Sequence, residues 1–332
     1  MKDHSGLKNI TIVIPVRPDD IPEKSIASVG KMDYPAELME VLIAEGWFPS
    51  LQRNEAVKKA KGDIVYFLDD DSDAPPDTLI KAVKHLNDSG ADVVGGPSLT
   101  PDTDTFIQKC FALMFASPFG GFNIRHRHKK SGKYRSATER ELISCNLAIK
   151  RDVFLRENGL KGELFPNEEN EFLDRLTARK YKLFYDPEMY VHRSQRKGIW
   201  RFFKQIFTYG RGRMDQTLMN PVFIKLYHFV PMLFVIYLAS IPFADNYFYL
   251  MPLFAYSALS LFFSGISALE ARRLACFFIM PIVFAVCHIA YGMGSIWGIL
   301  KKILKIEINR PSREIIVREM PVKRLGPDEK RY

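Results

Sequence analysis

The uneven distribution of apolar residues is the feature that most restricts how this chain can fold. Beyond Pro221, the segments 222–244, 247–268 and 274–300 contain very few charged residues. Each of them is long enough to cross a hydrocarbon core of roughly 30 Å. The first two hundred residues instead alternate apolar and polar positions, as soluble domains do. The sequence therefore predicts a globular front followed by a membrane-associated part.

Basic residues collect beside the apolar segments. Seven Lys or Arg and no acidic residue lie between Arg193 and Arg213, and the whole chain has a net charge of +9. Within this stretch, residues 200–209 alternate aromatic and basic side chains, which is typical of an amphipathic helix on a bilayer surface. Next to apolar spans, such charge favours membrane lipids with anionic headgroups and phosphorylated substrates as partners. Nucleic acid is not an expected partner.

The C-terminal charge restricts the membrane topology. The first residues are polar and the apolar run 10–16 is too short for a signal peptide, so we expect the globular front on the cytoplasmic face of the inner membrane. Three complete spans would place Lys301 and Lys302 outside, against the positive-inside tendency. Segment 274–300 also contains Pro281 and several glycines. A re-entrant hairpin or an interfacial helix in this segment would leave the tail inside, so we expect two full spans and a third, irregular element.

These features divide the chain into four predicted regions. The first is large enough to bury a core of its own. The regions are a globular domain over residues 1–198, an interfacial amphipathic helix with a Gly-Arg motif over 199–220, two to three membrane segments over 221–300, and a basic cytoplasmic tail over 301–332.

Strand and helix patterns alternate through the first hundred residues. Such alternation predicts an α/β fold with a mostly parallel sheet covered by helices, and ligands in such folds bind beyond the carboxyl ends of the strands. The predicted strands are 10–16, 40–45, 63–68 and 91–94, and the predicted helices are 22–30, 52–60 and 78–86. Further along, we expect helices over 106–115 and 167–180 and a mobile basic loop over 120–132.

An acidic cluster follows the third predicted strand, which runs directly into Asp69, Asp70 and Asp71. Three adjacent carboxylates cannot be buried without partners. Clustered oxygen ligands suit Mg²⁺ or Mn²⁺, and such an ion can neutralise a diphosphate. The alternative is a solvated turn and helix cap, since Ser72 and Pro75 follow.

An ordered series of motifs surrounds this cluster. Val13–Arg17, Glu45–Gly46, Arg53–Asn54 and Gly62–Asp71 follow one another in an order and spacing that resembles family 2 glycosyltransferases with the GT-A fold. The resemblance continues through residues 144–150, 168–176 and 209–213, and covers about two thirds of the chain. Within the family, the chain resembles most the bacterial exopolysaccharide transferases of the succinoglycan type, which carry similar C-terminal membrane segments.

The resemblance implies a site for a nucleotide-sugar donor. Pro15 and Arg17 would line the nucleotide pocket, and Arg53 would help to hold the nucleotide. Asp69 would face the ribose, and Asp71 would bind the metal. The metal would be Mg²⁺ or Mn²⁺, and a UDP-sugar is favoured as donor, with a GDP-sugar as the alternative.

Two further acidic residues belong to this predicted donor site. Asp70 is assigned to it together with its neighbours in the cluster, and Asp69 is also a candidate metal ligand beside Asp71. Glu45 stands where the family usually has an Asp that contacts the base, which leaves the identity of the base open. Its alternative role is a strand-end carboxylate that pairs with a nearby Lys.

A second acidic motif spans Asn167–Glu171. The family pattern is Glu-Asp, whose second carboxylate deprotonates the acceptor hydroxyl, and Glu169 occupies that position here. Adjacent carboxylates repel each other, which can raise one pKa and suit a general base. The alternative is an acidic first helical turn that complements the helix dipole, a role that Glu168 or Glu171 can fill.

A basic motif at Tyr209–Arg213 resembles the C-terminal motif that the family places near the donor diphosphate. Flexible glycines beside Arg211 and Arg213 would let the guanidinium groups reach phosphate. The alternative is a positive patch that sets membrane topology. His192, just upstream, could reach the metal or the diphosphate, although a single His is more often structural. The basic loop 125–140 is predicted to act on an acceptor phosphate or as a lid.

The motifs together predict an inverting glycosyltransferase in cell-surface or exopolysaccharide synthesis. The expected acceptor is a polyprenyl-diphosphate-linked saccharide at the cytoplasmic leaflet. The alternatives are transfer directly onto polyprenyl phosphate and a non-catalytic membrane scaffold that binds sugar nucleotides. A processive synthase is disfavoured because the Gln-x-x-Arg-Trp motif is absent from the sequence.

Overall fold

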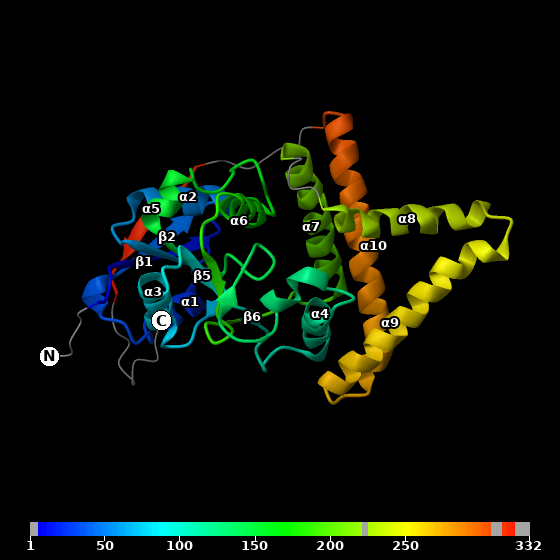
Figure 1. Ribbon diagram of the computed structural model, residues 1–332, viewed down its shortest axis with the longest axis horizontal. Coiled ribbons are helices and arrows are strands. Elements are labelled where there is room, and N and C mark those ends of the chain that lie inside the picture. The colour runs from blue at the N-terminus through cyan, green and yellow to red at the C-terminus, as the bar shows by residue number, and fades with distance from the viewer. Residues whose placement is uncertain (1–5, 221–224, 307–313, 323–332) are drawn as a thin grey trace. The chain divides into compact units, whose positions relative to one another are not determined.

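The chain forms two compact units, shown as a ribbon in Figure 1. The computed structural model describes residues 6–220, 225–306 and 314–322. The sheet unit comprises Met1–Pro101, His126–Ser194 and Arg310–Tyr332, and the helical unit comprises Asp102–Arg125 and Gln195–Asn309. This division differs from the predicted one, because residues 102–125 belong with the helices and the C-terminal residues belong with the sheet.

The sheet unit is built on an eight-stranded mixed sheet with the order β11-β2-β1-β3-β8-β5-β9-β7. Strand β1 lies parallel to both β2 and β3, whereas β8 and β11 are antiparallel to their neighbours β3 and β2. This architecture confirms the predicted α/β class. The strands are β1 (Ile10–Val16), β2 (Met39–Glu45), β3 (Ile64–Leu68), β5 (Val93–Gly95), β7 (Arg135–Ser136), β8 (Asn146–Lys150), β9 (Leu183–Tyr185) and β11 (Ile316–Met320).

Both faces of this sheet are buried. Every residue of β1 and β3 is buried, as the uninterrupted β-branched and aromatic runs predict. Ile12 belongs to the apolar cluster on one face and Val13 to the cluster on the other. The helices that follow the strands supply the remaining core; they are α1 (Glu23–Val29), α2 (Pro49–Lys59), α3 (Thr78–Asp88), α5 (Arg151–Arg156) and α6 (Glu168–Ala178).

A smaller sheet holds the turn that follows β3. It consists of β4 (Ser72–Asp73), β10 (Val191–Arg193) and β6 (Ser98–Leu99), with β10 between the other two. Arg193 is paired with Ser72 in the antiparallel register. This short pairing places a residue from late in the chain beside the acidic cluster.

The predicted basic tail over residues 301–332 contains a strand that the sequence analysis did not predict. Ile316–Met320 forms β11 and pairs antiparallel with β2 along its length. The segment Ile-Val-Arg-Glu-Met is short and charged, but its backbone pairs with the edge of an existing sheet, and this pairing stabilises the strand.

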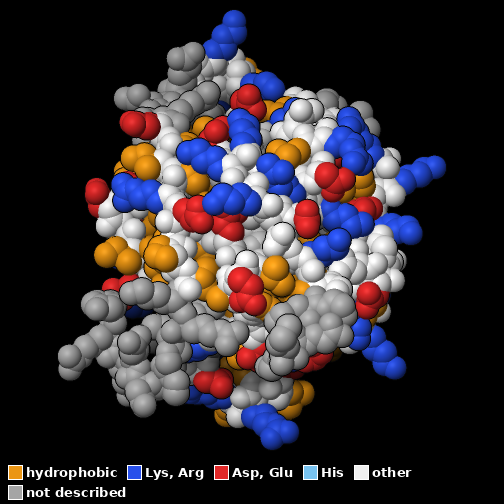
Figure 2. All heavy atoms as spheres, turned by 90° about the vertical axis from the view of Figure 1, so that its left-hand side faces the viewer, with side chains coloured by type: hydrophobic (Ala, Val, Ile, Leu, Met, Phe, Trp, Pro, Cys, Tyr) orange, Lys and Arg blue, Asp and Glu red, His pale blue; other side chains and the backbone are white. Residues whose placement is uncertain are grey.

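Figure 2 shows one face of the molecule, on which Lys, Arg, Asp and Glu side chains are interspersed.

In the part of the chain that the structure describes, the long apolar helices belong to the helical unit. Three of them are long and apolar enough to cross a membrane, namely Leu226–Phe243, Tyr247–Glu270 and Ala275–Ile303, in agreement with the three predicted segments. The first predicted residues, 222–224, lie outside the described residues. The main helices are α4 (Phe106–Ala116), α7 (Ile199–Met219), α8 (Val230–Ser240), α9 (Met251–Glu270) and α10 (Ala275–Ile303).

Two expectations for this unit were wrong. The third apolar segment is not irregular, because α10 is one helix of 29 residues with Pro281 inside it. Its glycines serve close packing instead, since a Cβ on Gly292 would clash with the carbonyl oxygen of Pro231 and one on Gly294 with that of Phe207. Likewise, the glycines at 210 and 212 are not flexible, because both lie inside α7.

Candidate active site

The carboxyl ends of three parallel strands meet at one edge of the sheet. Pro15 is buried near the end of β1, and Arg17 is exposed just beyond it. Val16 lies opposite Glu45, the last residue of β2, and β3 ends at Leu68, immediately before the acidic cluster. Predicted donor-site residues from these strands therefore lie at a common edge, as the parallel arrangement requires.

Gln52 holds two of these strand ends together. Its side chain is 2% exposed, and its amide nitrogen donates to the carbonyl oxygen of Val16 at 2.7 Å and to that of Ala44. Such buried hydrogen bonds fix the separation of the two backbones. The sequence analysis missed this residue, because a Gln on a helix carries no local sign of a distant partner.

Glu45 has a partner that the sequence did not identify. Arg318 of β11 lies 3.5 Å from its carboxylate, so the pairing expected with a lysine is made with an arginine. The Arg318 side chain is 69% exposed, and exposed pairs of this kind contribute little to stability. Glu45 is thus paired at the end of β2, and its predicted contact with the base stays a prediction.

Asp69 is held between two arginines. Its carboxylate accepts a hydrogen bond from Arg53 Nη2 at 2.6 Å, and Arg193 Nη2 lies 3.2 Å from its other oxygen. Arg53 is 3% exposed and is a buried counter-ion of this carboxylate, while its predicted contact with the nucleotide stays a prediction. Charge-assisted bonds of this kind fix the orientation of the carboxylate.

Asp71 shares Arg193 with Asp69. The Nε atom of Arg193 donates to Asp71 Oδ1 at 2.7 Å. Between the two, Asp70 is partly buried, and burial together with the negative charges of Asp71 and Asp69 raises its pKa to about 6. The cluster therefore has an excess of negative charge even with Arg193 in place, which is the condition that a bound cation relieves.

Glu168 connects the second acidic motif to the first. Its Oε1 lies 3.6 Å from Arg53 Nη1, so one guanidinium contacts both Glu168 and Asp69. Burial and the adjacent charge of Glu169 raise the pKa of Glu168 to about 8, although Arg53 opposes this shift. The repulsion expected between the paired carboxylates thus acts on Glu168.

Glu169 lies beside a different arginine. Arg127 Nη1 is 3.9 Å from its carboxylate, and the same guanidinium donates to Asn170 Oδ1 at 2.6 Å and to the carbonyl oxygen of Glu139. Arg127 is 5% exposed. It ends a 3₁₀ helix, Phe122–Arg127, in the segment predicted as a mobile loop, so this basic residue is fixed in place.

Carboxylates and guanidinium groups therefore alternate across the site. The series runs from Asp71 to Arg193, Asp69, Arg53 and Glu168 through the pairs described above. It joins the metal-binding motif that the sequence predicted to the motif that contains the predicted base. The sequence analysis did not identify Arg193 as the residue that links Asp69 and Asp71, because nothing in its local sequence distinguishes it from its basic neighbours.

The two histidines of residues 126–128 have no metal-like surroundings. His126 Nδ1 lies 2.6 Å from Ser131 Oγ. Burial and the guanidinium groups of Arg127 and Arg193 lower the pKa of His128 to about 3, so its ring is neutral at pH 7. A neutral imidazole among arginines suits the neighbourhood of an anion, in line with the predicted acceptor-phosphate role.

His192 adjoins the site on β10, where it pairs with Asp73 and Leu99. Its ring packs edge-on against Tyr190, and its Nδ1 is buried without a hydrogen bond among the described residues. Its predicted role as a metal ligand stays a prediction.

The acidic side chains of the site match the ligands that a divalent cation needs only in part. In residues 6–220, 225–306 and 314–322, no three His, Cys, Asp or Glu side chains are grouped as a ready-made metal site. Asp69 and Asp71 nevertheless supply oxygen ligands in a negatively charged setting. Mg²⁺ is commonly held by one or two carboxylates, with substrate phosphates and water completing its ligands. The residues present fit a cation that binds together with a nucleotide diphosphate.

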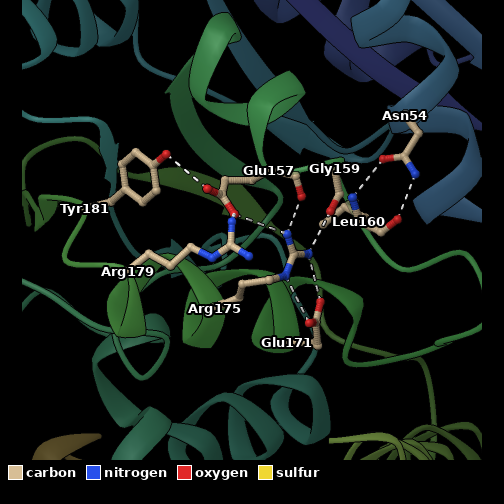
Figure 3. A network of polar contacts seen from close by, with 8 residues as sticks. All are labelled: Asn54, Glu157, Gly159, Leu160, Glu171, Arg175, Arg179 and Tyr181. Carbon is tan, nitrogen blue, oxygen red and sulfur yellow. Dashed lines mark hydrogen bonds and ion pairs between the residues drawn. The ribbon is translucent and has the colours of Figure 1, made fainter.

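A polar network supports α6, which carries both glutamates (Figure 3). Arg175 pairs with Glu171 one turn earlier and donates to the carbonyl oxygen of Gly159 at 2.8 Å. Asn54, next to Arg53 on α2, exchanges two hydrogen bonds with the backbone of Leu160. Helices α2 and α6 are thus fastened to the same loop, which fixes Arg53 relative to Glu168.

Arg211 and Arg213 lie on α7 in the helical unit, so they form part of a regular helix. Arg213 donates to Gln216 at 2.8 Å, and Arg211 lies 4.0 Å from Asp215. A Cβ on Gly210 would clash with the carbonyl oxygen of Tyr291, so this glycine permits close helix packing. The predicted contact of these arginines with the donor diphosphate stays a prediction.

Comparison with known proteins gives one family match and several matches among solved structures. Residues 41–156 match Glycosyl transferase family 2. A search of curated proteins found no match. The mannosyltransferase PcManGT from Pyrobaculum calidifontis, solved in complex with GDP-Man and Mn²⁺, has a TM-score of 0.57 at 16% identity over 87% of each chain. S. aureus TarS 1-349 in complex with UDP-GlcNAc has a TM-score of 0.43 at 14% identity, over 87% of this chain and 91% of that one.

The family match spans β2 to α5. It therefore includes Glu45, Arg53 and the acidic cluster, whereas Glu169 lies beyond it. The finer similarity to succinoglycan-type transferases is not addressed by these matches. The match over residues 41–156 is to a family 2 glycosyltransferase model, and the sheet unit has the α/β architecture of the GT-A fold.

Proposed function

We propose that the chain is a metal-dependent, inverting glycosyltransferase that moves a sugar from a nucleotide donor to a lipid-linked saccharide. The observation that carries this proposal is the alternating series of carboxylates and guanidinium groups. It brings the predicted metal ligand Asp71 and the predicted base motif at Glu168 and Glu169 into one connected site. If the acidic cluster were only a structural turn, no second acidic motif from a distant helix would be needed beside it.

The proposed reaction is a single displacement at the anomeric carbon. Glu169 removes the proton from the acceptor hydroxyl as its oxygen forms the new bond to the sugar. The bond from the anomeric carbon to the donor phosphate breaks, and the nucleoside diphosphate leaves. One displacement inverts the anomeric configuration. Arg127 Nη1 lies 3.9 Å from the carboxylate of Glu169 and helps to hold it in place.

The donor is held by residues at the strand ends. Pro15, Arg17 and Glu45 would contact the nucleoside, and Asp69 would face the ribose. Asp71, with Asp69, would hold Mg²⁺ or Mn²⁺. When bound, the cation supplies positive charge that stabilises the departing diphosphate. Arg211 and Arg213 are proposed as further phosphate contacts, because guanidinium groups bind phosphate in a bidentate manner.

The acceptor is proposed to be a polyprenyl-diphosphate-linked saccharide at the cytoplasmic face of the inner membrane. The long apolar helices support membrane attachment, and a lipid-linked acceptor presents its head group at the surface of the bilayer. The basic stretch from Arg193 to Arg213 would attract both anionic lipids and a diphosphate.

A donor panel tests the proposal. The purified full-length protein would be screened in detergent for thermal stabilisation by UDP-, GDP- and dTDP-sugars, with Mn²⁺ or with a chelator. GDP-sugars are included because the mannosyltransferase of similar fold was solved with GDP-Man and Mn²⁺. We expect stabilisation by one nucleotide class that depends on the metal. Stabilisation that persists in chelator would contradict the metal dependence.

Turnover separates an enzyme from a binding scaffold. We expect the selected donor to release nucleoside diphosphate with lipid-linked saccharide, and far more slowly with soluble sugars. In Asp71→Ala the metal-dependent stabilisation should be lost. The matched control is Asp152→Ala, since Asp152 is an exposed partner of Arg156 on α5, away from the site. Donor binding without any release in the presence of lipid-linked acceptors would favour the scaffold.

A further inference from the structure

The apolar helices of the helical unit do not share one environment. None of the Leu226–Phe243 window is buried and 17% of the Tyr247–Glu270 window is, compared with 39% for Ala275–Ile303. The most exposed side chains in the first two are large and apolar, including Phe243, Tyr247 and Phe254. Exposed apolar surface of this size marks a contact with lipid or with another protein.

The distribution of polar and apolar side chains on α9 suits a lipid environment. Its three buried residues are Ser260, Ser264 and Ser267. Its outward side chains include Phe262, which is 62% exposed, and Leu269, which is 79% exposed. A helix in water buries apolar residues and exposes polar ones, whereas small polar residues inside and apolar residues outside are typical of helices in a bilayer.

The C-terminal strand limits the number of crossings. Because β11 is hydrogen-bonded to β2, the chain must return to the side of the bilayer on which the sheet unit lies. The ion pair between Lys61 and Glu319, at 2.7 Å, belongs to the same contact. The helical unit, which lies between two parts of the sheet unit along the chain, must therefore cross the bilayer an even number of times or not at all.

Helices α7 and α10 run side by side in the same direction (Figure 1). A Cβ on Gly294 would clash with the carbonyl oxygen of Phe207, and eight residues further along α7, Asp215 lies 3.1 Å from Lys301. Ser295 also contacts the backbone of Gly210. With backbones this close, α10 must lie at the same depth in the bilayer as α7.

Helix α7 is too polar to cross a membrane. A charged side chain at the centre of a bilayer costs at least about 2.5 kcal/mol on insertion scales. Its charged residues are Arg201, Lys204, Arg211, Arg213 and Asp215, distributed over most of its length. Since α7 stays at the surface, α10 beside it stays there too, despite being the longest apolar helix.

The remaining two helices form a hairpin of suitable length. The window Leu226–Phe243 has 18 residues, about 27 Å as a helix, and Tyr247–Glu270 has 24 residues, about 36 Å. At the turn, Asp245 and Asn246 are polar and exposed. Figure 1 shows α8 and α9 as two arms that leave α10 and meet at this turn.

We propose that the α8–α9 hairpin is the part of the protein that crosses the lipid bilayer, out and back, while α10 lies along the membrane surface with α7. The sheet unit and the C-terminal strand then lie on one side, and the turn at Asp245 and Asn246 reaches the other. Tyr247 and Tyr249 flank the turn, where aromatic residues favour the interface. This inference is independent of the catalytic proposal.

Labelling of introduced cysteines tests the topology. The native cysteines are buried, so the wild-type protein serves as the blank. The full-length variants Asp245→Cys, Lys305→Cys and Lys133→Cys each place a thiol at an exposed position, the last on the sheet unit. Sealed membrane vesicles of one orientation would be treated with a membrane-impermeant maleimide, before and after permeabilisation.

We expect Lys305→Cys and Lys133→Cys to be labelled from the same side and Asp245→Cys from the opposite side only. Labelling of Lys305→Cys together with Asp245→Cys would show that α10 crosses and would overturn the inference. Labelling of all three from one side would also overturn it, because the hairpin would then lie in one leaflet or against a second protein. Resistance of the wild-type protein to alkaline carbonate extraction is expected in addition.

Discussion

The candidate site in the sheet unit is built from paired charges, whereas the helical unit is built from close helix packing and apolar side chains. At the site in the sheet unit, Asp69, Glu168 and Glu169 each lie within 4 Å of a buried arginine. In the helical unit, α7 and α10 approach through glycines, and the helices that leave them expose apolar side chains. The structure of the first region depends on ion pairs, and that of the second depends on steric fit between helices and on the medium around its apolar side chains.

This difference explains why the two regions should respond to different perturbations. Removing one partner of a buried ion pair leaves an uncompensated charge, which is costly. Adding one methyl group to a helix contact formed by backbone atoms is costly for a steric reason. Changes of charge should therefore act on catalysis and pH dependence, and changes of volume on the integrity of the helical unit.

The largest expected effect is on turnover. Glu169→Gln keeps the size of the side chain but removes the basic carboxylate, so turnover should fall by roughly 10²–10⁴-fold. Donor binding should remain, since the residue acts on the acceptor. The measurement is release of nucleoside diphosphate under saturating donor, with thermal stabilisation by donor as the binding readout.

A matched control uses the exposed Glu188, whose partner is Lys130. Glu188→Gln should leave turnover unchanged within about twofold, because exposed pairs of this kind contribute little. Wild-type turnover in Glu169→Gln would remove this residue from the mechanism and would direct attention to Glu168.

The next effect tests the helical unit with two glycines. Gly294→Ala places a methyl group against the backbone of Phe207, and we expect a loss of about 1–3 kcal/mol in stability. Gly265 on α9 has no atom within 4 Å of an added Cβ, so Gly265→Ala should be neutral or stabilising by up to about 1 kcal/mol. Thermal unfolding in detergent measures both, and equal responses would break the proposed distinction.

Local patterns in the sequence predicted much of the fold. The bounds of β1 are those predicted, because an uninterrupted run of β-branched residues indicates a strand that is buried on both faces. The strand β11 was missed because its stability comes from pairing with β2, which a window of five residues does not reveal. Glycines in α7 and α10 were misjudged because the sequence does not distinguish a flexible glycine from one that permits close packing.

The site was predictable as far as its acidic residues. The acidic cluster follows a strand and Glu169 lies in the first turn of a helix, so both carry local signals. Their counter-ions carry none, because Arg193 and Arg127 reach the carboxylates from distant parts of the chain. Arg53 was identified through the resemblance, but its buried pairing with Asp69 and Glu168 depends on how the helices pack.

A pH dependence of stability should follow from Glu168. Its folded pKa of about 8 lies above the ordinary value of 4.5, so the folded state binds the proton more tightly. Stability from this group is present below pH 4.5 and is lost as pH rises towards 8, by at most about 1.4 kcal/mol per pH unit. Glu168→Gln should flatten this slope. Chemical denaturation between pH 5 and 8 measures it, and an unchanged slope would assign the dependence elsewhere.

The smallest effect concerns how Arg193 and a cation share the acidic cluster. Arg193 neutralises part of the charge of Asp69 and Asp71, so it should weaken metal binding in the absence of donor. Arg193→Gln should therefore bind Mn²⁺ more tightly, by roughly tenfold, given an interaction of a few kcal/mol at such distances reduced by solvent. Electron paramagnetic resonance of free Mn²⁺ measures this without turnover. Arg156→Gln, an exposed pair on α5, is the charge-matched control and should have no effect. Weaker Mn²⁺ binding in Arg193→Gln would mean that the arginine orients the carboxylates for the metal and does not compete with it, and the alternating series would then be a scaffold for the cation site.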